Sequence, residues 1–168
     1  MSSSILPHTK LDWTISKLEE KVSSQPEDLD ARLELARCML SRGWMHEGGE
    51  ADCAAALQGA RRVLQEDPTS VLGLVVAGAA LVGMGRPEAA DKYLGQAAGI
   101  EPDRPDLNLA LGALAMAMGD HGRAVRWYEV ACRAASEAWE THLMLGQALM
   151  RLAKTQDPRR PIERASYH

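Results

Sequence analysis

The sequence contains no phenylalanine and few other aromatic residues, with four tryptophans and three tyrosines in 168 residues. Alanine and leucine supply most of its apolar side chains instead. A sheet core favours β-branched and aromatic residues, whereas closely packed helices favour alanine and leucine. The composition therefore predicts an all-α protein. With 46% hydrophobic and 25% charged residues, the chain has enough apolar material to fold.

Other features that the sequence lacks limit the cellular compartments and the classes of partner that we expect. The most apolar stretch, 71–84, is too short to span a bilayer, and the first residues lack the basic start and apolar stretch of a signal peptide. Three cysteines without a C-x-x-C pair predict free thiols in a reducing cytoplasm. A net charge of −4 argues against nucleic-acid binding. We therefore expect a cytoplasmic protein that neither inserts into membranes nor binds nucleic acid, and its arginine, alanine and glycine content is typical of bacteria.

Signatures of catalysis are also missing. None of the five histidines has ligand or triad spacing, and no G-x-x-x-x-G-K or G-x-S-x-G motif occurs. The polar residues His46, Glu47, Glu50, Asp52 and Cys53 include metal-ligand types, but one polar loop rarely fixes four ligands, so a solvated loop is the favoured interpretation. We expect no catalytic residue, no metal site and no cofactor.

The strongest positive feature of the sequence is an internal repeat with a constant period. A fixed period of this size indicates a solenoid, in which each unit buries its apolar face against its neighbours. Within one unit, an apolar run, a glycine-containing break at 83–85 and a second run that begins with Pro87 predict helix, turn, helix. The equivalent positions are Gly78, Gly112 and Gly146; Ala56, Ala90 and Ala124; and Pro68 and Pro102.

In this register the chain resembles the tetratricopeptide repeat family over roughly residues 11–153. The family has a small residue late in the first helix, small residues near the start and end of the second, one bulky position in that helix, and a closing proline. The resemblance implies an all-α helix-turn-helix solenoid of about eight helices. The small first-helix positions are Ala36, Gly78, Gly112 and Gly146; the bulky positions are Ala60, Leu94 and Tyr128; the late small positions are Val63, Ala97 and Ala131.

The expected organisation is a single array between two irregular ends. The ranges are a disordered N-terminus at 1–10, a leading helix at 11–24, repeats at about 29–68, 71–102 and 105–136, a capping helix at 138–153, and a flexible tail at 154–168. The fourth unit is incomplete because Pro158 stands where the second helix would place its small residue.

The first repeat is longer than the period, since the interval from Pro26 to Pro68 exceeds that from Pro68 to Pro102 by eight positions. The extra residues fall around 44–53, between the two expected helices. Two interpretations remain open: the connecting loop bulges, or the second helix begins early, near Glu50, and runs to about Gln65.

In the family that the chain resembles, the first helix of each repeat lines a concave groove. Mapping the family's groove positions onto this sequence gives an apolar middle with charges toward the ends. The predicted groove residues are Leu33, Arg37, Leu40, Leu72, Val75, Ala79, Val82, Leu109, Ala113, Met116, Leu143, Gln147, Met150 and Arg151.

These residues predict a non-catalytic adaptor or scaffold that binds a peptide or helix of a partner protein in an apolar groove. The alternative is that the chain's own leader or tail, or a second copy in a homodimer, fills the groove. Two more specific functions also fit the resemblance: a bacterial type III secretion translocator chaperone, and a scaffold subunit of a motility, envelope or signalling assembly.

Overall fold

The computed structural model describes residues 10–45, 49–134 and 139–156, and within these ranges the chain forms eight α-helices and no strand. The all-α solenoid predicted from the sequence is therefore confirmed. The helices are α1 (Lys10–Ser24), α2 (Leu29–Met45), α3 (Glu50–Glu66), α4 (Val71–Gly83), α5 (Pro87–Ile100), α6 (Pro105–Ala117), α7 (His121–Ala134) and α8 (Trp139–Gln156).

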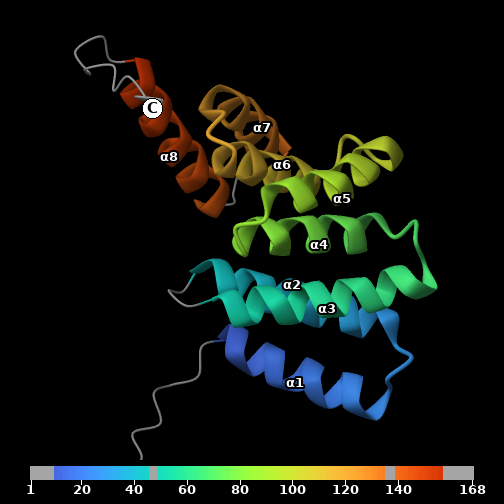
Figure 1. Cartoon of the computed structure of the whole chain (residues 1–168). Coiled ribbons are helices and arrows are strands. Elements are labelled where there is room, and N and C mark those ends of the chain that lie inside the picture. Colours follow the sequence, from blue (N-terminus) through green and yellow to red (C-terminus); the bar gives the residue numbers. More distant parts are fainter. Residues whose placement is uncertain (1–9, 46–48, 135–138, 157–168) are drawn as a thin grey trace, which may run out of the picture.

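The helices stack in chain order, with α1 at one end of the array and α8 at the other (Figure 1). The pairs α2–α3, α4–α5 and α6–α7 form three helical hairpins, and each second helix also packs on the first helix of the next unit. The first helices α2, α4 and α6 follow one another in contact, α2 with α4 and α4 with α6, so they form one side of the stack. No helix in the described part of the chain is both long and apolar enough to cross a membrane.

Two glycines in left-handed backbone make the hairpin turns possible. Gly85 has a φ of 70° and Gly119 a φ of 78°, a region that other residues rarely adopt. The equivalent position one period later is Ala153. Without the glycine, α8 continues through this position to Gln156. Residues 154–156, which we expected in the tail, are therefore helical.

Close packing within a repeat depends on a glycine opposite a large side chain. A Cβ atom on Gly78 would lie 2.5 Å from Cδ2 of Leu94, and one on Gly112 would lie 2.5 Å from Cδ1 of Tyr128, both too close for real contacts. Leu94 and Tyr128 are almost fully buried. In the longer first repeat, Ala36 instead lies against Gly59. In the second and third repeats, leucine and tyrosine therefore fill the space that the glycine leaves, without a phenylalanine.

Seven of the eight extra residues of the first repeat lengthen its helices. Helix α2 has 17 residues where α4 and α6 have 13, and α3 has 17 where α5 and α7 have 14. The interpretation that the second helix begins near Glu50 is confirmed. Assigning Trp44 to the connecting loop was wrong, because α2 continues to Met45.

The ends of the array carry one helix each. Helix α1 buries Ile15, and α8 packs on α7 through Ala148 and Leu152. The disorder expected at 1–10 and the tail expected at 154–168 fall, apart from Lys10 and residues 154–156, outside the described residues. The division into leader, repeats and cap stays a prediction as a whole.

Candidate partner-binding groove

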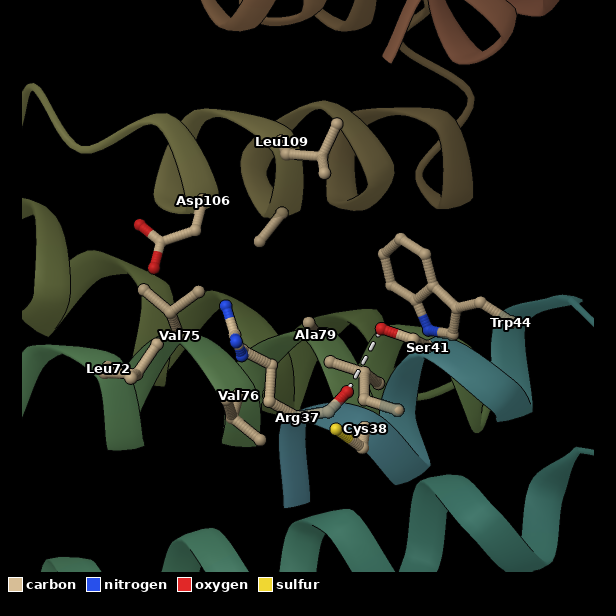
Figure 2. A pocket seen from close by; sticks show the side chains of 12 residues that line it. Arg37, Cys38, Ser41, Trp44, Leu72, Val75, Val76, Ala79, Asp106 and Leu109 are labelled. Carbon is tan, nitrogen blue, oxygen red and sulfur yellow. Dashed lines mark hydrogen bonds between the residues drawn. The ribbon is translucent and has the colours of Figure 1, made fainter. Parts of the chain in front are cut away.

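A cavity of about 440 Å³ opens along the side of the stack formed by the first helices. Helix α4 lies between α2 and α6 and contacts both of them, and side chains from all three helices line the cavity (Figure 2). The lining residues are Arg37, Cys38, Leu40, Ser41, Trp44, Leu72, Val75, Val76, Ala79, Asp106, Leu109 and Ala110.

The charged groups of this cavity are Arg37 and Asp106. Arg37 donates a hydrogen bond to Glu34 at 2.6 Å, and Arg104 donates two hydrogen bonds to Asp106, each at 2.9 Å. Burial raises the pKa of Asp106, but the hydrogen bonds and positive charge of Arg104 outweigh it and hold this pKa below its usual value. The hydrogen bond to Glu34 raises the pKa of Arg37, and the charge of Asp106 contributes. Both groups therefore stay ionised at neutral pH.

The opposite end of the cavity is aromatic. Trp44 lies there, in the extra turn of α2, while Arg37 points toward the Asp106 end (Figure 2). The ring of Trp44 approaches α4 closely, since a Cβ atom on Gly83 would lie 2.9 Å from its Nε1. This Nε1 is buried and has no hydrogen-bond partner among the described residues. The lengthened helix therefore supplies one wall of the groove.

Beyond Trp44 the groove continues toward α8 as a second hollow of about 340 Å³. Trp44 lines both cavities, and side chains of α4, α6, α7 and α8 complete the second one. Its lining residues are Gly43, Trp44, Val82, Gly83, Ala113, Met116, Tyr128, Met144 and Gln147. A further recess, lined by Met116, Ala117, Gln147, Met150, Arg151 and Lys154, follows at the α8 end.

Twelve of the fourteen predicted groove residues line these cavities. Arg37, Leu40, Leu72, Val75, Ala79 and Leu109 line the first; Val82, Ala113, Met116 and Gln147 line the second; Met150 and Arg151 line the third.

The other two predicted residues lie elsewhere. Leu33 is only 7% exposed and belongs to the core of the first repeats, whereas Leu143 is 52% exposed on α8 and lines none of the three cavities. The prediction that the groove binds a partner is not tested by its shape and stays a prediction.

The fourteen predicted residues do not include six others that line the first cavity: Cys38, Ser41, Trp44, Val76, Asp106 and Ala110. Trp44 carries a signal that was available in the sequence: it follows Leu40 by four residues and Arg37 by seven, which places all three on one helix face.

The polar residues of the lengthened repeat form ion pairs. Arg42 donates to both carboxylate oxygens of Asp52 at 2.7 Å and to Asp12 of α1 at 3.1 Å. Cys53 is buried, and this burial raises the pKa of its thiol. The described residues contain no group of three or more histidine, cysteine, aspartate or glutamate side chains that could hold a metal ion, and His46 and Glu47 lie outside them.

Comparisons with known proteins find the same type of fold in tetratricopeptide repeat proteins. The family model described as tetratricopeptide repeat matches residues 81–134. The chain is similar to TTC0263, a thermophilic TPR protein of Thermus thermophilus, at 20% identity and a TM-score of 0.64, over 83% of this chain and 73% of that one. It is also similar to two structures of MamA, at 19% and 17% identity, with TM-scores of 0.56 and 0.53.

The two MamA comparisons cover 85% and 89% of this chain, and 74% and 98% of those chains. No curated protein matches the chain in sequence. At these identities the structural likeness concerns the fold. Together with the helical hairpins and the family model matched over residues 81–134, it supports a tetratricopeptide repeat protein.

Proposed function

We propose that the chain is a non-catalytic interaction module that binds a peptide or helical segment of a partner protein in the groove along α2, α4 and α6. Tetratricopeptide folds serve protein–protein interaction in general, and the family is generally non-catalytic. The observation that carries the proposal is the first cavity, whose lining is mostly apolar although it opens to the surface. An apolar groove of this kind is the usual docking site for an amphipathic helix or extended segment.

The lining indicates how such a segment would be held. Apolar side chains of the partner would contact Leu72 of α4, Leu109 of α6 and the ring of Trp44 at the end of the groove. Arg37 and Asp106, which are both ionised, would fix the direction of the segment by pairing with opposite charges at its other end. Long-range electrostatic attraction would contribute less to binding than this direct pairing, because Arg37 and Asp106 each already have an ionic neighbour.

The experiment that tests this proposal is selection of binding peptides from a displayed library, followed by affinity measurements. Leu72→Glu places a charge in the apolar part of the groove at a half-buried position, and should weaken selected peptides by about tenfold or more. Ile100→Glu is the matched control, because Ile100 is an exposed apolar residue of α5 that lines none of the cavities of the groove. Equal affinities of the two variants would contradict binding in this groove.

A secretion chaperone for translocator proteins is the second candidate function. The observation that favours it is the leading helix α1, which packs on α2 before an array of three complete repeats. Coexpression with a candidate cargo separates this function from that of a scaffold subunit of a motility, envelope or signalling assembly. A chaperone should keep an otherwise insoluble cargo in a stable complex, whereas a scaffold should bind a partner that is already folded.

The expected location is the cytoplasm of a bacterium. This location is supported by the three cysteines, which are all free thiols in the structure.

A further inference from the structure

One face of α8 lacks the cover that the equivalent face has in the complete repeats. In the second repeat Leu94 of α5 lies over Gly78, and Leu81 beside it is only 1% exposed. In the third repeat Tyr128 of α7 lies over Gly112. In both cases the second helix of the hairpin buries this face of the first.

In α8 the equivalent residues are Gly146 and Leu149. The opposite face of α8 packs normally, since Thr141 and Ala148 are buried as Leu107 and Leu114 are in α6. However, Leu149 is 46% exposed, and a Cβ atom on Gly146 would meet no described atom within 4 Å. Helix α8 thus has the form of the first helix of a fourth repeat, with the place of the second helix open among the described residues.

The sequence after α8 continues the repeat register. The interval from Gly78 to Leu94 equals that from Gly112 to Tyr128, and Ile162 follows Gly146 by the same interval. The late small position of the repeat is also present, because Ala165 follows Ala131 by one full period. The chain therefore carries a large apolar residue at the position that covers the glycine in the preceding repeats.

The prolines of this segment nevertheless argue against a regular second helix. Ala153 replaces the turn glycine, so α8 runs on to Gln156, and Pro158 and Pro161 would interrupt a helix after it. The segment would have to fold back in irregular form. Gly146 lies about 15 Å back along the helix from Gln156, and the six residues to Ile162 span up to about 20 Å when extended. Ile162 can therefore reach Gly146.

We propose that residues 157–168 fold back onto this face of α8 and place the side chain of Ile162 over Gly146, in contact with Leu149. This contact is distinct from the proposed function, because neither Gly146 nor Leu149 lines the cavities of the groove. In this arrangement the segment covers the α8 face and leaves the groove open to a partner. The competing occupants of the α8 face are a second copy of the chain and a helix of another protein.

Disulfide trapping in the full-length chain tests the register. Leu149→Cys is combined with Ile162→Cys, and the matched control combines it with Glu163→Cys, one residue out of register. The intrachain 149–162 disulfide, identified by mass spectrometry of peptides in a glutathione buffer, should form about tenfold faster than the 149–163 disulfide. Equal rates, absence of the bond, or a bond only between two copies would overturn the proposal.

Hydrogen exchange in the intact chain provides a second readout. Ile162→Ser should speed amide exchange in the last turns of α8 by about tenfold, whereas Ile162→Leu should preserve the slower exchange. Unchanged exchange in Ile162→Ser would overturn the proposal. Both experiments are independent of peptide binding in the groove, so failure of one proposal leaves the other standing.

Discussion

At the scale of single residues, the second and third repeats pair a glycine of the first helix with a large side chain of the second. The large partner differs, leucine in one and tyrosine in the other, and the glycine is common to both. Glycine is intrinsically unfavourable inside a helix by about 1 kcal/mol relative to alanine. Its presence at Gly78 and Gly112 is explained by the space that Leu94 and Tyr128 occupy.

Gly112→Ala should therefore destabilise the protein although alanine is the better helix former. The new methyl group would overlap Tyr128, and displacing this buried ring should cost about 1–3 kcal/mol in the free energy of unfolding. Gly95→Ala is the control, because a Cβ atom there meets open space, and it should stabilise by about 0.5–1 kcal/mol. Denaturant unfolding measures both. Stabilisation by both substitutions would show that the glycine–tyrosine contact is not tight.

Tyr128 should make the protein sensitive to alkaline pH. Burial raises the pKa of Tyr128 from 10.0 to about 12, so the folded state holds the proton more strongly than the unfolded state does. The stability that this group contributes is complete below pH 10 and is lost as the pH rises through 12. Tyr128→Leu, which introduces the residue of the second repeat, should remove this part of the alkaline loss. The free energy of unfolding of the two proteins is compared from below pH 10 up to about pH 12. An equal loss of stability in both proteins would exclude the contribution of Tyr128.

At the scale of helices, the first repeat differs from the others by an added turn at the adjoining ends of α2 and α3. Arg42 lies in this region and connects three helices, through Asp52 of α3 and Asp12 of α1. Its hydrogen bonds to Asp52 raise the pKa of the guanidinium still further. The same added turn carries Trp44 into the groove. One lengthening thus supports both the leading helix and one wall of the groove.

Arg42→Gln should weaken this end of the array. It removes the paired hydrogen bonds to Asp52 and leaves a partly buried carboxylate, which should cost about 1–2 kcal/mol in the free energy of unfolding and speed amide exchange in α1. Arg62→Gln removes an exposed pair with Glu66 and should change stability by less than about 0.5 kcal/mol. If both variants lost the same stability, the connection through Arg42 would have no special structural role.

The helices were predictable where the period was regular. The glycine at position 85 and the proline at position 87 mark a turn and a helix start that depend on local backbone geometry, so the sequence alone located them. The end of α2 was not predicted, because the regular period places Trp44 in the turn, although its spacing from Arg37 and Leu40 fits a helix. The contacts of Arg42 with α1 and α3 involve residues 30 and 10 positions away, which sequence spacing does not reveal.

At the scale of the whole molecule, the array is a row of similar units that stack in chain order (Figure 1), and the first helices α2, α4 and α6 contact one another in succession. Because this geometry repeats, most groove positions could be assigned from the sequence. Leu33 and Leu143 were the exceptions: each belongs to a unit at an end of the array, where the neighbours differ from those inside it. What occupies the groove depends on a partner's surface and so could not follow from this sequence.

The central claim, that the apolar groove binds a partner segment, is tested most directly by photo-crosslinking with a peptide selected for binding. A benzophenone amino acid replaces Leu109, in the wall of the groove, or Ile100, on α5 outside the cavities. The account predicts efficient crosslinking from position 109, competed by unlabelled peptide, and little from position 100. Equal crosslinking from both positions, or crosslinking only from position 100, would contradict it.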